Sequence, residues 1–450
     1  MQPVVSIKIN QDEYPELVIH PQTAAVIGLG SKKLAFVSFG NQKHYVNISL
    51  NDLIPPEQVL LAPKVVAALH LPDYPSYELA VNHNEIIIGP CIGLLLRKDD
   101  NKLTASFLQK MLVYVREYST LHGAVIVFAL NKVDPAHRLI EGYCYNPSQH
   151  YWQRGVFTYP AAIYRMIGLS DEWKNHLLAA LGDTVFNNRY FSKWEMYQWF
   201  ANDPDLSPHL PETLLYHTPQ DVLDLLERFP QIYIKPVSGL RGRGIVRISK
   251  EDHQFCFKYR EAGANCNLTL EATQVSAYLQ KRFGRGCYLI QQAIDLLEYA
   301  DGIIDFRCVV QKNQSNDWVC QAIIGRHGAQ GSIVSNISNG GADFPGEDLL
   351  AKALAPSQTN LLAVQQQIVN FAVLVCNTLT EYGINCGTLG LDIGIDSLGC
   401  LLLIEINNRD PDPTIALNIG DRQLYYTLKT GPLWYAKSLA GFNTLLHSTE

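Results

Sequence analysis

Short runs of alternating apolar and polar residues fill the first 80 positions of the chain. Residues that favour turns separate these runs, which are Val4–Ile9, Leu17–Ile19, Leu34–Ser38 and Tyr45–Leu50. Such alternation indicates strands with one buried face, because successive side chains of a strand point to opposite sides. We therefore expect residues 1–84 to form a β-rich N-terminal region, with a single helix over Val59–Leu71.

From Glu85 onward the apolar runs become longer. Ile86–Pro90 has the pattern of a strand that ends in a Gly-Pro turn, and Ala124–Ala129 is a second continuous apolar run. Between them, Ser106–Leu121 has helical spacing. The order strand, helix, strand is typical of a parallel sheet. Residues 85–185 are therefore predicted to form a small α/β domain.

The remaining residues, 186–450, mix both kinds of pattern. Helical spacing predicts three helices, at Ser192–Phe200, Pro219–Arg228 and Leu361–Tyr382. Apolar runs predict strands at Ile232–Lys235, Ile245–Ile248, Cys287–Gln291, Arg307–Gln311, Val319–Ile324, Thr388–Ile395 and Leu401–Ile406. The whole chain is thus expected to have an α/β (α+β) fold.

Composition narrows the functional classes. Of the 450 residues, 47% are hydrophobic and 18% are charged, which is ordinary for a globular protein. The formal charge of −7 argues against broad electrostatic binding to nucleic acid. We find no signal-peptide pattern and no apolar stretch of the roughly 18–20 residues that a membrane span needs. A cytoplasmic protein is expected.

A glycine-rich loop follows the expected strand that ends at Lys235. Ser238, Gly239, Gly242 and Gly244 lie in this loop. Glycines let the backbone come close to phosphate oxygens, and a lysine adds a point charge suited to phosphate. The loop lacks the Walker pattern and lies between two strands, unlike a Rossmann fingerprint. Taken alone, it fits a flexible hairpin with solvated arginines better than a phosphate site.

Two carboxylates and an amide lie in a second hairpin near the C-terminus. Glu405 and Asn407 share one face of a strand because they are two residues apart, and Asp392 can face them from the partner strand. Oxygen donors of this kind suit magnesium. The alternative, a polar stripe facing solvent, fits poorly beside such apolar flanks.

This combination resembles the ATP-grasp superfamily, in which ATP lies between two subdomains. The resemblance implies that Lys235 and Lys193 contact the nucleotide, that 238–244 is the flap, and that Asp392, Glu405 and Asn407 bind Mg²⁺. It also implies that Leu289–Ile294 is the hinge that reads adenine, and this segment contains Gln291, Gln292 and Ile294. Superfamily members often have a glutamate there, whereas this chain has two glutamines.

A closer resemblance, to the YheC/YheD family of endospore coat-associated proteins, covers nearly the whole chain. Its matching segments include Ile88–Gly93, Phe186–Asn188, Asp305–Arg307 and Ser332–Gly341. Arg307 resembles the arginine that related enzymes direct at a γ-phosphate or acyl-phosphate, and an ion pair between Asp305 and Arg307 at the surface is the alternative. The candidates for acceptor binding are Arg326, Asn336, Gly340 and Gly341, although Asn336 could equally form a turn.

The resemblance implies an ATP-grasp fold preceded by a pre-ATP-grasp domain, with ATP and Mg²⁺ as cofactors. The expected activity is an ATP-dependent carboxylate–amine ligase that forms an acyl-phosphate, and a kinase would use the same site. The alternative is a non-catalytic protein of the spore coat that keeps the fold. The acceptor is expected to be a small molecule or a peptide, but the sequence does not identify it. The oligomeric state and any partner in the spore coat also stay open.

Overall fold

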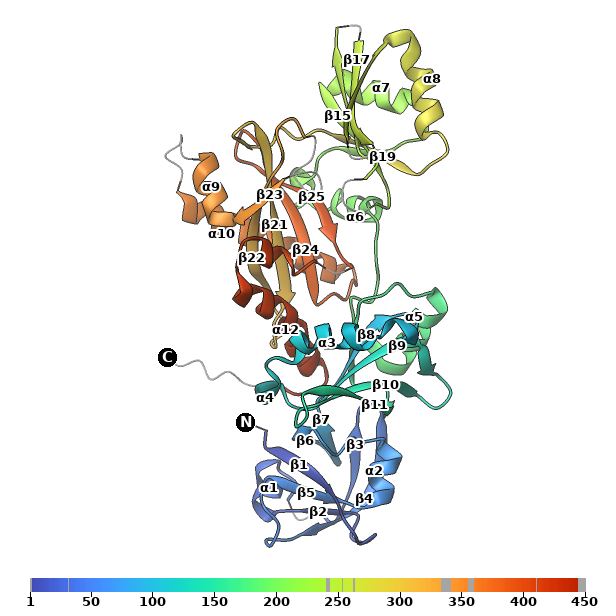
Figure 1. Ribbon diagram of the computed structural model, residues 1–450, viewed down its shortest axis with the longest axis vertical. Coiled ribbons are helices and arrows are strands. Elements are labelled where there is room, and N and C mark those ends of the chain that lie inside the picture. Colours follow the sequence, from blue (N-terminus) through green and yellow to red (C-terminus); the bar gives the residue numbers. More distant parts are fainter. Residues whose placement is uncertain are drawn as a thin grey trace.

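Four β-sheets follow one another along the long axis of the molecule (Figure 1). The computed structural model describes residues 2–30, 32–239, 243–252, 254–261, 264–332, 341–354, 360–409 and 411–443. An N-terminal barrel lies at one end and the sheet that contains β15 (Gln231–Pro236) lies at the other. The order of the sheets from the barrel follows the order of the chain, except that the third sheet along the chain lies beyond the fourth.

The first sheet is a closed barrel in the order β1-β5-β2-β4-β3-β7-β6. Its strands are β1 (Val4–Ile9), β2 (Leu17–Ile19), β3 (Leu34–Phe39), β4 (Gln42–Leu50), β5 (Gln58–Leu61), β6 (Ser76–Asn82) and β7 (Glu85–Gly89), with α1 (Pro21–Val26) after β2. The prediction of a single helix over Val59–Leu71 is wrong. The segment forms β5 and then α2 (Pro63–Leu69), because Pro63 fits the first turn of a helix and ends the strand before it.

The second sheet has the order β11-β10-β9-β8-β12-β13. Its strands are β8 (Cys91–Arg97), β9 (Ala124–Asp134), β10 (Leu139–Asn146), β11 (Tyr151–Thr158), β12 (Ala162–Arg165) and β13 (Val185–Phe186), and α5 (Asp171–Leu181) lies between the last two. Strand β8 runs parallel to β9 and β12, as the strand–helix–strand pattern predicts. The first strand of that unit is β8, however, because Ile86–Gly89 pairs inside the barrel as β7.

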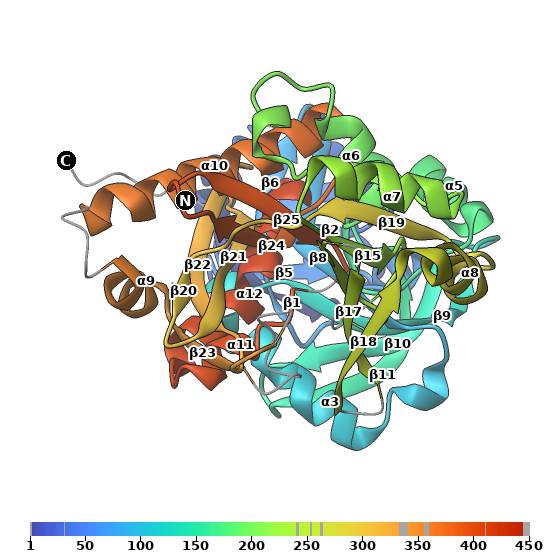
Figure 2. The same ribbon diagram turned by 90° about the horizontal axis from the view of Figure 1, so that it is seen from above.

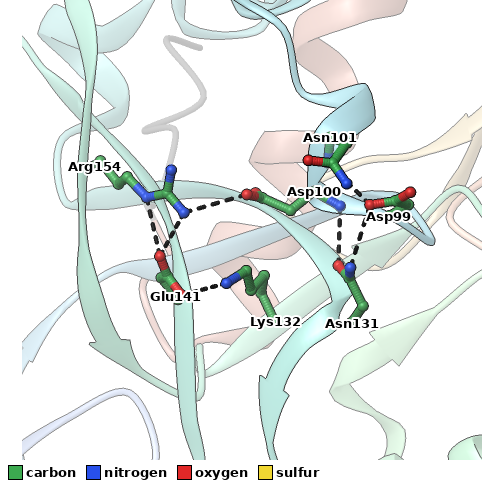
Figure 3. A network of polar contacts seen from close by, with 7 residues as sticks. All are labelled: Asp99, Asp100, Asn101, Asn131, Lys132, Glu141 and Arg154. Atoms are coloured by element: carbon green, nitrogen blue, oxygen red, sulfur yellow. Dashed lines mark hydrogen bonds and ion pairs between the residues drawn. The ribbon is translucent and has the colours of Figure 1, made fainter.

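The helical segment between β8 and β9 is also broken. It consists of α3 (Ala105–Met111), η2 (Leu112–Val115) and α4 (Tyr118–Leu121) rather than one helix. On strands β9 to β11, Glu141 forms ion pairs with Lys132 and Arg154, and Arg154 also pairs with Asp100 (Figure 3). Lys132, Glu141 and Arg154 are partly exposed, so solvent weakens these ion pairs and the network contributes little to stability.

The third sheet is antiparallel, in the order β14-β19-β15-β16-β17-β18. It comprises β14 (Thr213–Leu215), β15, β16 (Val246–Glu251), β17 (Gln254–Glu261), β18 (Ala264–Glu271) and β19 (Tyr288–Gln292). Two helices, α7 (Pro219–Arg228) and α8 (Ala272–Phe283), pack on one face through apolar side chains such as Leu225 and Leu279. The helix expected at Pro219–Arg228 is confirmed, with its predicted limits.

The fourth sheet has the order β23-β22-β21-β24-β25. Its strands are β20 (Glu298–Tyr299, paired with β21), β21 (Gly302–Lys312), β22 (Trp318–His327), β23 (Ala342–Pro345), β24 (Thr388–Ile395) and β25 (Leu401–Asn407). Helices α9 (Gly346–Leu354) and α10 (Leu361–Glu381) contact β22 on one side (Figure 2). Helices α11 (Ile415–Asn418) and α12 (Arg422–Leu439) cover apolar residues on the other face.

By length and composition, helix α10 is long and apolar enough to cross a membrane. No segment of this kind was expected from the sequence. Its side chains Ile368, Phe371, Val375 and Leu379 belong to the core of the fourth sheet. Core helices of soluble proteins pass the same test, so this is weak evidence for a span.

Helix α12 extends from the fourth sheet to the first two. Leu428 packs against the fourth sheet, and Leu433 and Tyr435 pack against the second. Near the end of the helix, the fully buried Lys437 donates to Glu78 of the barrel at 2.5 Å. The proposed division of the chain at residues 84 and 185 stays a prediction, since α12 belongs to more than one of these parts.

Candidate nucleotide site

The glycine-rich loop connects the antiparallel strands β15 and β16 at the edge of a cleft. Ser238 and Gly239 line this cleft, whereas Gly242 lies outside the described residues. Gly244 has a φ of +75°, a left-handed conformation that glycine adopts without strain. Gly244 thus sets the course of the backbone just before β16.

Lys235 stands near the end of β15, and no carboxylate of the described residues forms an ion pair with it. Its Nζ donates to Oε1 of Gln291 on β19 at 2.6 Å, and the amide of Gln291 donates to Oγ1 of Thr213 at 2.9 Å. Burial lowers the pKa of Lys235 to about 8, although Glu405 acts in the opposite direction. A cation held by a neutral amide keeps its charge available for an anionic ligand.

The predicted hinge is a central strand of the third sheet. Strand β19 pairs with β14 on one side and with β15 on the other. Gln292 accepts from the backbone of Glu212 at 3.2 Å, and Ile294 lies two residues beyond the strand. Both glutamines therefore serve contacts within the sheet, and adenine recognition by this segment stays a prediction.

The predicted metal ligands lie on neighbouring strands. Asp392 on β24 is directly opposite Glu405 on β25, and Asn407 is opposite Gly390. Asp392 is only 6% exposed and is held by two arginines. Arg307 donates from Nε to Oδ1 at 2.5 Å, and Nη2 of Arg326 lies 3.0 Å from Oδ2. Burial alone would raise the pKa of Asp392, but the two guanidinium groups lower it below its usual value.

These residues belong to a polar row that crosses the fourth sheet from edge to edge. Strand register places its members on one face: Asp343 on β23, Arg326 on β22, Asp305 and Arg307 on β21, Asp392 on β24 and Glu405 on β25. Asp305 binds Arg326 through two hydrogen bonds of 2.6 and 2.7 Å. Asp305 pairs with Arg326 and Arg307 pairs with Asp392, so each has a partner on another strand, and neither is an exposed surface residue.

Lys193 joins the two sides of the cleft. It is the first residue of α6 (Lys193–Phe200), and a capping box between Ser192 and Glu195 fixes the start of this helix. Its Nζ lies 2.9 Å from Oε1 of Glu405 and 3.4 Å from the carbonyl oxygen of Gly239. One ammonium group thus contacts both the fourth sheet and the glycine-rich loop.

The cleft between these elements has a volume of about 850 Å³. Its lining includes residues predicted from the sequence, namely Lys193, Ser238, Gly239, Glu405 and Asn407. Other lining residues were not predicted as site residues, among them Tyr190, Asn408 and Arg409, and Arg243 was predicted only as part of the flap. Arg243 lies in the predicted flap, and Asn408 and Arg409 directly follow the predicted metal ligand Asn407, so proximity to the motifs could have indicated them.

The donor set fits a magnesium ion in composition. Among the described residues no three His, Cys, Asp or Glu side chains gather at a metal-binding distance, so a third donor must be of another type. Asn407 supplies one: its Nδ2 is buried without a hydrogen-bond partner in the described part of the chain. The two ends of an amide are interchangeable by rotation, which would place an oxygen there.

The structure describes two of the four predicted acceptor residues, Arg326 and Gly341. Arg326 lies in the polar row and is 7% exposed. Gly341 precedes β23, and Asn336 and Gly340 fall outside the described residues. An acceptor site at these positions stays a prediction.

Comparison with known proteins identifies the family of the chain. Residues 182–439 match the model of the YheC/D like ATP-grasp family. The chain is 25% identical over 378 residues to the endospore coat-associated protein YheD of Bacillus subtilis (strain 168), covering 78% of this chain and 80% of that protein. It is 21% identical over 226 residues to YheC of the same organism, covering 48% and 59%.

Among solved structures, the ATP-grasp ligase PsnB complexed with a minimal precursor matches 76% of this chain and 99% of its own, with 13% identity and a TM-score of 0.43. The family match, which spans more than half of the chain, confirms the resemblance and the mixed α/β ATP-grasp fold predicted from the sequence. The chain belongs to the YheC/D-like ATP-grasp family.

Proposed function

We propose that this chain binds ATP and Mg²⁺ in the cleft and uses ATP to join a carboxylate to an amine. The observation that carries the proposal is the position of Lys193, whose ammonium contacts both Glu405 and the glycine-rich loop. A nucleotide phosphate between loop and sheet would meet this cation, and Lys235, on the strand that leads into the loop, would supply a second positive charge. The cleft volume of about 850 Å³ is within the range of roughly 300–1,000 Å³ that ligand pockets occupy.

In the proposed reaction a carboxylate oxygen attacks the γ-phosphorus of ATP. The bond from that phosphorus to the β,γ-bridging oxygen breaks, and ADP leaves with the electron pair. An amine then attacks the acyl carbon, inorganic phosphate leaves, and the amine gives up a proton. Magnesium held by Asp392, Glu405 and Asn407 would neutralise phosphate charge.

Arg307 is the residue of the polar row that can contribute to transfer. It uses Nε and Nη2 on Asp392, and Nη1 makes no hydrogen bond within the described residues. A guanidinium fixed in this way offers a donor to charge that develops on the transferred phosphoryl group without reorganising. Arg326 is engaged by Asp305 and Asp392 and would position Asp392 rather than contact the substrate.

ATP binding is tested by isothermal titration with and without Mg²⁺. The variants Lys193→Met and Glu405→Gln should each weaken Mg-ATP binding by at least about tenfold, since both disrupt the ion pair at the cleft. Lys250→Met is the control, because Lys250 lies on β16, the strand that follows the glycine-rich loop, and pairs with Glu227 outside the cleft. Absence of Mg-ATP binding by the native chain would refute the proposal.

Turnover is tested by ADP release across panels of carboxylic acids and amines, with Glu405→Gln as the inactive control. Acceptor-dependent ADP release supports the ligase. ATP binding without turnover for any acceptor would instead favour the second candidate, a non-catalytic protein that keeps the nucleotide site. The endospore-coat association of YheD leads us to include spore-coat localisation of a tagged chain as a separate readout.

A further inference from the structure

A large pocket lies where the barrel meets the part of the chain that forms the second sheet (Figure 1). Its volume is about 1070 Å³, close to the upper limit of the roughly 300–1,000 Å³ that ligand pockets occupy. The barrel contributes residues of β1 and of the start of β6, and η2, α4 and the turn between β10 and β11 contribute the rest. Among the described residues, none lines both this pocket and the nucleotide cleft.

The lining of this pocket has an excess of positive charge, although the formal charge of the chain is −7. Lys8 and Arg116 are exposed on the lining, and Asp73 is its one acid among the described residues. Neither cation forms an ion pair with a described residue. The guanidinium carbon of Arg116 lies 4.0 Å from the ring centre of Tyr426 on α12, which orients this side chain without using its N–H donors. Exposed cations that have no counter-charge favour an anionic ligand.

A contact between Ser76 and His122 joins the two sides of the pocket. Ser76 of β6 is paired with Ser6 of β1, and Lys8 is two residues beyond Ser6, so it lies on the same face of the strand. Oγ of Ser76 lies 2.9 Å from Nδ1 of His122, which directly follows α4. Arg116 lies at the end of η2, just before that helix. The cations and the histidine therefore come from adjoining segments that enclose one cavity.

His122 has a backbone conformation that glycine alone adopts without strain. Its φ is +56° and its ψ is −172°. Residues held in such conformations cluster at ligand-binding and active sites, where the surrounding structure keeps them in place. When the Ser76 hydroxyl donates to Nδ1, the ring proton is on Nε2, from which it can be offered to an anion. A side chain is thus kept where a glycine would fit the backbone better.

The least exposed part of the lining is aromatic. Tyr118 and Tyr145 are 7% and 6% exposed, and their ring centres are 5.1 Å apart. The hydroxyl of Tyr118 donates to the carbonyl oxygen of Gly123 at 2.8 Å, and the hydroxyl of Tyr145 lies 3.1 Å from Nδ1 of His150. Because both hydroxyls are engaged, the rings remain as apolar surface for the organic part of a ligand.

We propose that this pocket binds a small phosphate monoester that carries an aromatic ring. The phosphate lies on Arg116, with Lys8 and His122 as further donors, and the ring packs against Tyr118 and Tyr145. A guanidinium can bind phosphate through two parallel hydrogen bonds, and a lysine adds a point charge. Phosphate suits this set of donors better than a carboxylate, because it offers three acceptor oxygens. The site does not depend on the proposed ligase activity.

The test is isothermal titration of the full chain with phenyl phosphate in the absence of nucleotide. Phenyl phosphate should bind, and phenol, which lacks the phosphate, should bind at least about tenfold more weakly. Benzoate keeps the ring but replaces the phosphate by a carboxylate, and inorganic phosphate lacks the ring, so both should also bind more weakly. If phenyl phosphate does not bind, or if any of these analogues binds equally well, the proposal is wrong.

Two variants locate the binding within the pocket. Arg116→Gln changes an exposed side chain and should weaken phenyl phosphate binding by at least about tenfold. Arg97→Gln is its control, because Arg97 is the last residue of β8, lies 4.1 Å from the ring centre of Phe107 and does not line the pocket. His122→Gly should bind more weakly while it keeps its thermal stability, since glycine adopts this backbone conformation without strain. Native affinity in either Arg116→Gln or His122→Gly would overturn the proposal.

Lys193→Met separates this pocket from the nucleotide cleft. This variant should lose affinity for Mg-ATP, yet it should bind phenyl phosphate as tightly as the native chain does. Weaker binding of phenyl phosphate by Lys193→Met would place the ligand in the nucleotide cleft and overturn the proposal. Because the titrations contain no nucleotide, a failure of Mg-ATP binding by the native chain would leave their result unchanged.

Discussion

Raising the pH through 8 should weaken ATP binding by this chain, because the pKa of Lys235 is about 8. Burial lowers this pKa from 10.5, so the free protein loses the charge of Lys235 in a range where ordinary lysines keep it. A bound phosphate would favour the protonated form and raise the pKa again. The contribution of Lys235 to affinity is therefore complete below pH 8 and falls above it, by about tenfold or 1.4 kcal/mol per pH unit.

The assay is the dissociation constant of Mg-ATP, measured by titration from about pH 7 to about pH 9.5, where the phosphates of ATP no longer titrate. Lys235→Arg is the control, because an arginine stays charged throughout this range and should give a nearly flat profile. Lys235→Met should bind more weakly at every pH and also give a flat profile. A native profile without a decline, or the same decline in Lys235→Arg, would refute the reasoning.

Three further predictions concern buried polar groups. Lys437→Met should lower the free energy of unfolding by about 3–5 kcal/mol in urea denaturation, because it leaves the buried carboxylate of Glu78 without its counter-charge. The double variant with Glu78→Leu should recover much of this loss. Arg326→Lys should reduce thermal stability, because a lysine cannot make the paired hydrogen bonds to Asp305, and circular dichroism melting would detect the shift. Asn407→Leu should leave stability nearly unchanged, as its Nδ2 has no partner within the described residues, but should remove the Mg²⁺ dependence of ATP binding in titrations.

The sequence predicted best those elements whose pattern is local. The hairpin around Asp392 and Glu405 follows from period-2 alternation and a glycine turn, and the antiparallel pairing confirms it. Likewise, Ser192 caps the start of α6 and Pro219 is the first residue of α7, and both helices begin where the sequence predicts. Each of these signals lies within a few residues of the feature it specifies.

Features that depend on distant contacts were not predictable in this way. Ile86–Gly89 and Cys91–Arg97 are both apolar, and only their pairing partners decide which strand closes the barrel and which begins the parallel sheet. Similarly, Arg307 is two residues from Asp305 but 85 from Asp392, with which it pairs.

The position of α12 has a consequence for how the molecule is made. This helix leaves the ribosome after every strand of the four sheets, yet its side chains complete apolar clusters of the fourth and second sheets. Lys437 must also find Glu78, which is 359 residues earlier in the chain. Until synthesis passes Leu439, the barrel carries an unpaired acid and two sheets keep open apolar surface, which is a condition that favours aggregation. Chaperone dependence during synthesis should therefore end with the addition of this one helix.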